Sequence, residues 1–346
     1  MFEVNDISPL NRARIQPGDA EFRCIKDTCP HFDICGGKWI YDDSRFCDND
    51  CQNCIETCCK RDTGFKIAEN LGGLEFDDIK WEKTDFKTAR FAWTVSGKVA
   101  NLEQPMYLIP VDCLVDRRTG MWAGTMSLHD RYSIPDTSQI GITFSFKDWL
   151  LEYLKRHEDD VYQELRKYDV DFVLPINYSV WRNYPRLDQL IQMRKKMLSM
   201  KRLQDVGIKT IPDVAVTRDI DVNRYADWLL ENDCNIVYCT IQGVKKRNDD
   251  EWRRVMDVSV QLKEKISNLH VLMAGIGTKN MANALSIFGD DLTIVNASCW
   301  VFAELRIHIL TREHMRKRGM SIQDVFKFNV ETLQEYINAL TNAPQK

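Results

Sequence analysis

The strongest constraint on the fold is a regular alternation of strand-length apolar runs with helix-length amphipathic stretches, which begins after Pro135. The runs are almost continuously apolar, which is typical of parallel strands buried on both faces. The expected strands span residues 140–144, 172–176, 209–214, 236–241, 271–275 and 292–295. The expected helices span residues 146–167, 185–206, 222–232, 249–267, 279–288 and 300–318.

Six strand–helix units make up much of a (β/α)8-type barrel, and an incomplete or irregular barrel of this type fits them too. Residues 90–95 and 106–111 have strand-like patterns and would supply earlier strands of the same α/β sheet. A doubly wound open sheet is the alternative architecture. A final amphipathic helix is expected after Ser321, which is suited to be its N-cap.

Composition divides the chain into two parts. Residues 1–64 are polar and rich in cysteine, whereas residues 65–346 hold the barrel pattern and the C-terminal helix. The first residues do not have the charge and apolar pattern of a signal peptide, and no run is long enough to span a membrane. We therefore expect a cytoplasmic protein with no membrane partner. The net charge of −4 gives the chain as a whole no electrostatic attraction to nucleic acid, although local basic clusters exist.

Eight of the twelve cysteines lie close together near the N-terminus. In a reducing compartment, closely spaced thiols are typical of metal binding rather than of disulfides. The predicted ligands are Cys24, Cys29, Cys35, Cys47, Cys51, Cys54, Cys58 and Cys59.

The metal is either an iron–sulfur cluster (4Fe-4S) or zinc. We favour iron–sulfur because the cysteine spacings do not repeat the regular pairs of zinc ribbons. The spacing of Cys47, Cys51 and Cys54 also resembles that of radical S-adenosylmethionine enzymes, but the residue before the last cysteine is Asn53 rather than an aromatic. His31 is expected to be a solvated loop residue.

In parallel α/β folds, ligands bind at the carboxyl ends of the strands. The side chains expected there include amides, a carboxylate and hydroxyls, which suit the edge of a nucleobase. Tyr178 or Trp300 could stack on such a base. The residues at these ends are Asn177-Tyr178-Ser179, Asp213, Gln242-Gly243, Gly275-Ile276-Gly277-Thr278 and Asn296-Ala297-Ser298. Helix caps and turns are the other interpretation of each position.

Two segments carry a family resemblance. Residues 237–255 (VYCTIQGVKKRNDDEWRRV) resemble the strand and helix of tRNA-guanine transglycosylases, where an Ile-Val-Gln-Gly-Gly turn leads into a helix with acidic and arginine residues. Residues 270–296 (HVLMAGIGTKNMANALSIFGDDLTIVN) resemble the next segment of that family. They also resemble the corresponding sequence of DNA-modifying relatives that insert 7-deazaguanine bases. The resemblance implies a barrel that recognises or modifies a guanine-type base in DNA or tRNA.

The resemblance also implies roles for particular residues. Gln242 matches the glutamine that binds the base, and Asp213 matches the aspartate that hydrogen-bonds the guanine edge. Gly275 and Gly277 match the glycines beside the pocket, and Gly243 follows Gln242 in the same turn.

Two positions depart from the family. Its nucleophilic aspartate falls on Asn296, and its second catalytic aspartate falls near Asn177. An amide cannot form a glycosyl–carboxylate intermediate or act as a carboxylate base. The family's zinc site after the last strand is also missing, since only Cys299, His308 and His314 lie there.

A second resemblance covers residues 169–216. The stretches LPINYSVW (174–181) and GIKTIP (207–212), with Tyr184-Pro185 between them, are similar to an uncharacterised family of phages and mobile elements. This family implies no activity. Three functions therefore stay open: an enzyme that modifies a base in nucleic acid, a non-catalytic nucleic-acid or partner-binding protein with a structural metal, and an iron–sulfur radical enzyme.

Overall fold

The computed structural model describes residues 67–83, 86–115, 122, 124, 127–144, 154–180, 186–217, 219–240, 249–315 and 319–341. The chain divides into two compact units. One comprises Met1–Ile79 and Tyr178–Leu198, and the other comprises Lys80–Asn177 and Ser199–Lys346. The larger unit begins at Lys80, later than the change of composition at residue 64. The eight predicted metal-binding cysteines and His31 lie outside the described residues.

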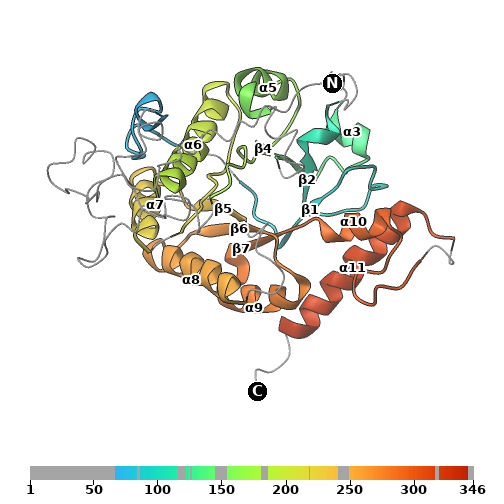
Figure 1. Ribbon diagram of the computed structural model, residues 1–346. Helices are drawn as coiled ribbons and strands as arrows, with labels where there is room; N and C mark the ends of the chain where they lie inside the picture. Colours follow the sequence, from blue (N-terminus) through green and yellow to red (C-terminus); the bar gives the residue numbers. More distant parts are fainter. Residues whose placement is uncertain are drawn as a thin grey trace, which may run out of the picture. The chain divides into compact units, whose positions relative to one another are not determined.

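The larger unit is an α/β structure built on a seven-stranded sheet in the order β4-β3-β2-β1-β7-β6-β5. All the strand pairs are parallel, as the apolar runs predict. The sheet is curled (Figure 1), and β1 and β7, the first and last of the described strands along the chain, are neighbours in its middle. The strands are β1 (Phe91–Thr94), β2 (Met106–Pro110), β3 (Gln139–Thr143), β4 (Phe172–Val173), β5 (Ile236–Thr240), β6 (His270–Ala274) and β7 (Leu292–Asn296).

Residues 209–214 link the two edge strands of this sheet. Thr210 forms a parallel bridge with Val173 of β4, and Asp213 forms a parallel bridge with Tyr238 of β5. Backbone hydrogen bonds support both bridges: Val173 N donates to Lys209 O over 2.9 Å, and Tyr238 N donates to Pro212 O over 2.7 Å. The architecture is thus compatible with an incomplete barrel.

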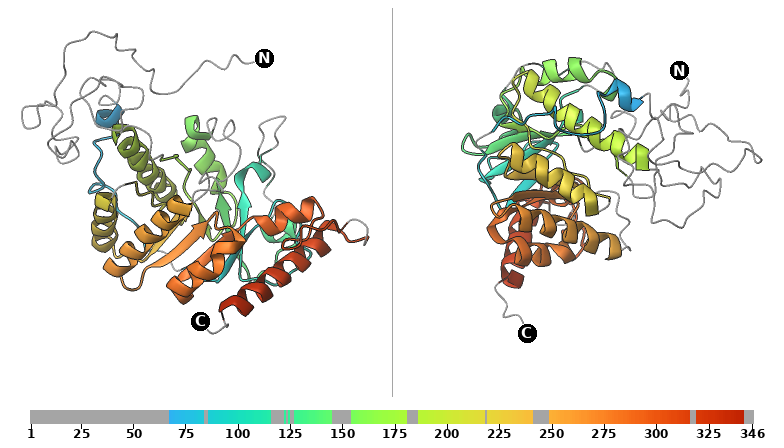
Figure 2. Two further views of the ribbon diagram at one scale, coloured as in Figure 1. Left: turned by 60° about the horizontal axis from the view of Figure 1, so that its bottom comes forward. Right: turned by 90° about the vertical axis from the view of Figure 1, so that its left-hand side faces the viewer.

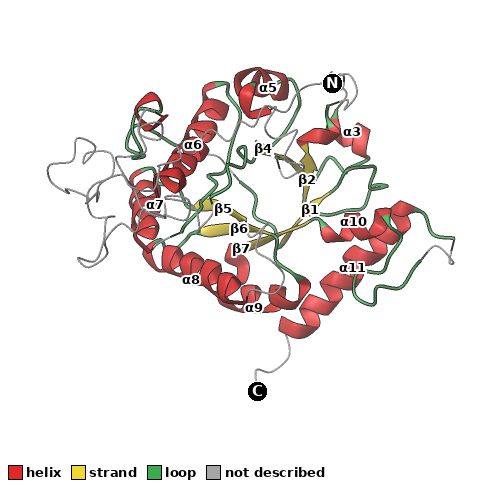
Figure 3. Ribbon diagram, in the orientation of Figure 1, coloured by secondary structure: helices red, strands yellow, loops and turns green. Residues whose placement is uncertain are grey.

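Helices lie outside the strands in the larger unit (Figure 3), and Figure 2 shows α8 and α9 along β6 and β7. The helices are α3 (Leu128–Tyr132), α5 (Glu158–Leu165), α6 (Arg186–Asp205), α7 (Asp219–Glu231), α8 (Asp249–Lys265), α9 (Thr278–Phe288), α10 (Ser298–Glu304) and α11 (Ile322–Thr341). Two 3-10 turns, Val111–Cys113 and Gly289–Asp291, follow β2 and α9. Helix α6 belongs to the smaller unit up to Leu198 and to the larger unit from Ser199.

The prediction of one helix over residues 300–318 is wrong. Helix α10 ends at Glu304, and Arg306 adopts a left-handed φ of 53° that interrupts the helical backbone. The chain then folds back, so that Ile307 and His314 form an antiparallel bridge. The apolar periodicity continued past residue 304 because Ile309 and Met315 are also buried, although in non-helical segments.

The inward face of the sheet is filled by side chains. Gly141 on β3 pairs with Leu108 on β2 and with Phe172 on β4. A Cβ atom added to Gly141 would lie 2.4 Å from Phe172 Cζ and 2.6 Å from Leu108 Cδ2. Both side chains therefore occupy the space in front of the glycine, and one of them would have to shift to admit a Cβ atom at this point of the sheet.

Candidate functional site

Asp213 is the predicted site residue whose position is most constrained. In parallel pairing, register partners share a face of the sheet, as do alternate residues along one strand. The partner of Asp213 is Tyr238, which pairs with Leu272 of β6. Following register partners from β6 through β7 and β1 to β2 and β3 shows that Leu272 shares a face of the sheet with Leu108 and Gly141. Asp213 consequently lies on the inward face, at the carboxyl end of its segment.

The opposite edge of the sheet gives the same result. Phe172 is on the inward face of β4, so its neighbour Val173 faces outward, as does Thr210 in register with it. Three residues further along the extended segment, Asp213 returns to the inward face. Its side chain is 1% exposed, so this carboxyl group lies at the carboxyl ends of the strands with little access to water.

Several buried polar side chains lie close together in the segment that follows Asp213 and in helix α7. Asp221 is fully buried and its Oδ2 accepts hydrogen bonds from Thr217 N (3.2 Å) and Thr217 Oγ1 (3.1 Å). Arg224 Nη1 lies 3.9 Å from Asp221 Oδ1. Burial raises the pKa of Tyr225 well above its ordinary value, and the negative charges of Asp213 and Asp221 raise that pKa further. Tyr225 therefore stays a neutral phenol.

The glycines after β6 have different requirements. Gly275 has a φ of +86°, which L-residues rarely adopt, so the turn requires glycine there. Gly277 precedes α9 with a φ of −68°, and a Cβ atom added to it meets nothing within 4 Å. A side chain at position 277 would therefore meet no clash at its Cβ atom.

Asn296, which aligns with the nucleophilic aspartate of the resembled family, has a structural role. Its Oδ1 accepts a hydrogen bond from Cys299 N over 3.0 Å, so the amide caps the start of α10. Asn296 is 3% exposed and in register with Trp93, which faces away from the interior of the sheet. The side chain is thus directed to a helix rather than to the inward face that carries Asp213.

Trp300 is packed inside the larger unit. Its Nε1 donates to Glu304 Oε1 over 2.8 Å, and its ring meets Phe326 edge-on with centroids 5.1 Å apart. A Cβ atom on Gly97 would lie 2.8 Å from Trp300 Cζ2, so the loop after β1 covers the ring as well. Trp300 is 5% exposed, and this packing leaves it little surface on which a base could stack.

Asn177 and Tyr178 are adjacent but belong to different compact units. Asn177 is partly exposed, at the end of the segment that continues from β4. Tyr178 is 8% exposed, and Lys195 Nζ lies over its ring at 5.8 Å from the centroid. Gln242 and Gly243 lie outside the described residues, so their predicted contacts with a base stay predictions.

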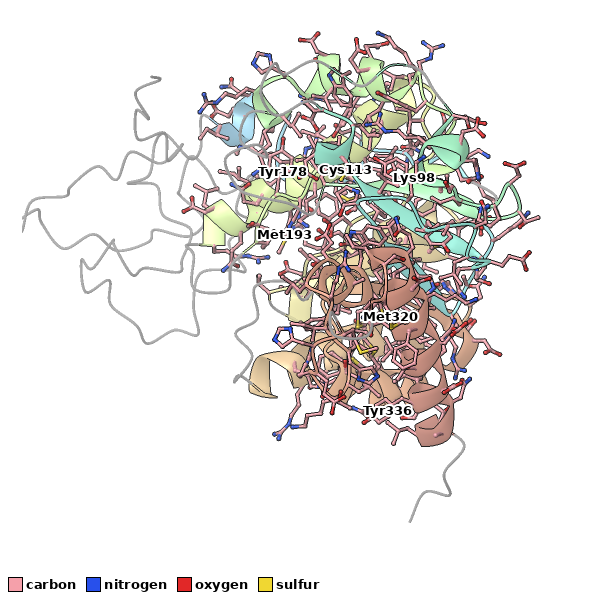
Figure 4. The ribbon with its side chains drawn as sticks, turned by 90° about the vertical axis from the view of Figure 1, so that its right-hand side faces the viewer. Lys98, Cys113, Tyr178, Met193, Met320 and Tyr336 are labelled. Carbon is pink, nitrogen blue, oxygen red and sulfur yellow. The ribbon has the colours of Figure 1, made fainter. Side chains whose placement is uncertain are left out.

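Other polar groups at the carboxyl ends of the strands were not singled out from the sequence. Thr143 on β3 and Thr240 on β5 share the inward face with Asp213, according to the pairing of their strands. Cys113 lies in the turn after β2 (Figure 4), where Arg131 Nη2 and Tyr132 Oη donate to its carbonyl oxygen over 3.2 Å and 3.3 Å. Strand-end position was the signal for all three, but single threonines and cysteines are too common there to be distinguished.

No group of His, Cys, Asp and Glu side chains suited to a metal ion occurs among the described residues. Within the same part of the chain, no helix has an apolar stretch of the length needed to cross a bilayer. None of the four described cysteines, Cys113, Cys234, Cys239 and Cys299, forms a disulfide. No family model matches the sequence, and no curated protein matches it.

Proposed function

We propose that this protein recognises a guanine-type base in DNA or tRNA at the carboxyl ends of its parallel strands. The observation that carries the proposal is Asp213, a buried carboxylate on the inward face of the curled sheet. The finer architecture belongs to the same proposal: residues 209–214 serve as an eighth strand that completes a (β/α)8-type barrel.

A carboxylate suits the guanine edge because of its hydrogen-bonding groups. Ionised aspartate only accepts hydrogen bonds, and it presents two oxygens. The ring N–H and the exocyclic amino group of guanine present two neighbouring donors, so one carboxylate can bind both. Asp213 is only 1% exposed, so a base would reach it after the residues that cover it have moved, and the charge-assisted bonds would then form with little competition from water.

Chemistry on the base is a separate matter from its recognition. Asn296 caps α10 through its amide oxygen, and an amide supplies no nucleophile for base exchange. A recognition protein, or an enzyme whose chemistry differs from that of the resembled transglycosylases, fits these residues better than simple base exchange. If the protein is a degenerate transglycosylase, Asn296→Asp should gain base-exchange activity; no gain would count against that origin.

The predicted metal completes the proposal. The eight N-terminal cysteines, outside the described residues, would hold an iron–sulfur cluster (4Fe-4S) or zinc as the organising element of residues 1–64. Protein purified without oxygen that is brown and absorbs near about 400 nm would support iron–sulfur ligation. Colourless protein with stoichiometric zinc would exclude the radical enzyme.

The decisive experiment compares two aspartates at opposite ends of the strands. Asp213→Asn replaces one acceptor oxygen by an N–H donor, which would face an N–H donor of the base. We expect it to weaken 7-deazaguanine binding by about 30- to 150-fold in calorimetry. Asp171→Asn is the matched control. Its Oδ2 accepts from Ile140 N over 2.7 Å at the amino ends of β3 and β4, and an amide oxygen can replace it. Equal affinities for Asp213→Asn and the wild type would refute the proposal.

A further inference from the structure

A buried chain of hydrogen bonds connects α5 and α6 to the segment that follows β4. Its members all belong to the larger unit: Glu158 and Tyr162 on α5, Ser199 on α6, and the backbone of Ile176. Tyr162 Oη lies 2.7 Å from Glu158 Oε1 and 2.5 Å from Ser199 Oγ, and Ile176 N lies 3.3 Å from Ser199 Oγ.

The direction of each bond follows from the chemistry of its ends. A carboxylate can only accept, so Tyr162 donates to Glu158. With its proton used there, the tyrosine oxygen accepts from the Ser199 hydroxyl. The serine oxygen in turn accepts from the N–H of Ile176. All the donors thus point toward Glu158, and bonds aligned in one direction strengthen one another.

The negative end of the chain is compensated at the surface of α6. Glu158 is 4% exposed, and a buried carboxylate is costly unless it is paired. Arg202, which is 46% exposed on its side chain, donates to Glu158 Oε2 over 2.5 Å. Glu158 is thus paired with Arg202 through one oxygen and accepts from Tyr162 through the other, which fixes the polarity of the hydrogen-bond chain.

Among the described residues, helix α6 supports the segment that follows β4. Strand β4 contains Phe172 and Val173, and in the described part of the chain the backbone bond to β3 that follows them is Leu174 N to Ile142 O, over 2.9 Å. Beyond that point, the N–H of Ile176 is bound by Ser199 rather than by a neighbouring strand. Asn177 is the next residue, at the place where the resemblance puts a catalytic group.

We infer that Tyr162 and Ser199 are positioning residues for Asn177, with Glu158 as the anchor of their hydrogen-bond chain. The inference rests on the proposed function, because it takes Asn177 to contribute to base binding. In this arrangement the backbone at Ile176 is fixed before the base arrives, and the binding energy is not spent on ordering it.

The test compares two tyrosines that each lose one buried hydroxyl. Tyr162→Phe should weaken 7-deazaguanine binding about tenfold, because the variant loses the net free energy of one hydrogen bond that holds the backbone in place. Tyr107→Phe is the control. Tyr107 is fully buried on β2, and its hydroxyl donates to Leu102 O over 2.5 Å, away from the inward face. We expect a similar loss of thermal stability in both variants and a loss of affinity only in Tyr162→Phe.

Further variants keep the outcomes distinct. Ser199→Ala, which leaves the Tyr162–Glu158 bond in place, should reproduce the loss of affinity and carries the comparison if Tyr162→Phe does not fold; Ser199→Thr, which keeps a hydroxyl, should restore binding. Unchanged affinity in both Tyr162→Phe and Ser199→Ala would overturn the inference, as would an equal loss in Tyr107→Phe. If Asp213→Asn weakens binding while Tyr162→Phe and Ser199→Ala do not, only the positioning role is refuted. If Asp213→Asn also binds the base normally, the proposed function is refuted.

Discussion

Replacing Gly141 by alanine should destabilise the larger unit more than any other glycine-to-alanine change at a described residue with a normal backbone conformation. The added methyl group would lie 2.4 Å and 2.6 Å from two atoms of the Phe172 ring and 2.6 Å from Leu108 Cδ2. Non-bonded carbon atoms prefer separations of about 3.5–4.0 Å, so three contacts would be strongly repulsive. The ring cannot easily retreat, because Phe172 is 2% exposed and packs edge-on against Phe86, with centroids 5.2 Å apart.

Overpacking of this kind costs about 1–3 kcal/mol, and the number of close contacts places Gly141→Ala at about 2–3 kcal/mol. For a unit of this size, that loss lowers Tm by about 5–10 °C. Thermal unfolding followed by circular dichroism measures the change. Gly277→Ala is the matched control, since no atom lies within 4 Å of its added Cβ and its φ is −68°. It should unfold close to the wild-type temperature, because the lower entropy of the unfolded chain offsets the poorer N-cap that alanine makes for α9.

A double-mutant cycle tests the assigned cause. Phe172→Leu alone should destabilise by leaving a cavity, but in the Gly141→Ala background it should make room for the new methyl group. The double variant should therefore be at least about 1 kcal/mol more stable than the sum of the single losses predicts. A wild-type Tm for Gly141→Ala, or strict additivity with Phe172→Leu, would refute the reasoning that the inward face is closed by these side chains.

Three further predictions concern stability. Burial lowers the pKa of His270 to about 4, so the unfolded chain binds this proton first as the pH falls; stability should decline below about pH 6.5, by about 2 kcal/mol between pH 7 and pH 5 in urea unfolding, and His270→Gln should remove that part of the decline. Gly275→Ala should cost about 1–2 kcal/mol because of the φ of +86°, and a loss no greater than that of Gly277→Ala would contradict this. Ser321→Ala should cost about 1 kcal/mol, since Ser321 Oγ accepts from Asp324 N over 3.1 Å while the Asp324 carboxylate accepts from Ser321 N over 3.1 Å; no change in Tm would show that this cap does not stabilise α11.

The sequence predicts the parallel α/β sheet well because nearly every strand is an uninterrupted apolar run. All seven strands overlap predicted ones, and residues 209–214 lie between β4 and β5 as expected for a further strand. The helix predicted over 300–318 fails because burial, not helical structure, explains its apolar residues after Glu304.

The site is less predictable than the fold. Sequence position identifies Asp213 as a strand-end carboxylate, but only the register of both edge strands shows that it faces inward. The capping role of Asn296 and the packing of Trp300 depend on α10 and α11, which no local pattern relates to the strand ends. The hydrogen bonds that connect Glu158 to Ile176 join residues from three separate segments, so they can be recognised only in the three-dimensional structure.

The pairing of Asp213 with the guanine edge is tested most directly by changing the base and the protein together. 7-Deazahypoxanthine lacks the exocyclic amino group of 7-deazaguanine, so it offers Asp213 one donor fewer. Wild-type protein should bind it about 10- to 30-fold more weakly in calorimetry, whereas Asp213→Asn should bind the two bases with nearly equal affinity. Equal binding of both bases by the wild type, or full discrimination by Asp213→Asn, would contradict the assignment of this carboxylate to base recognition.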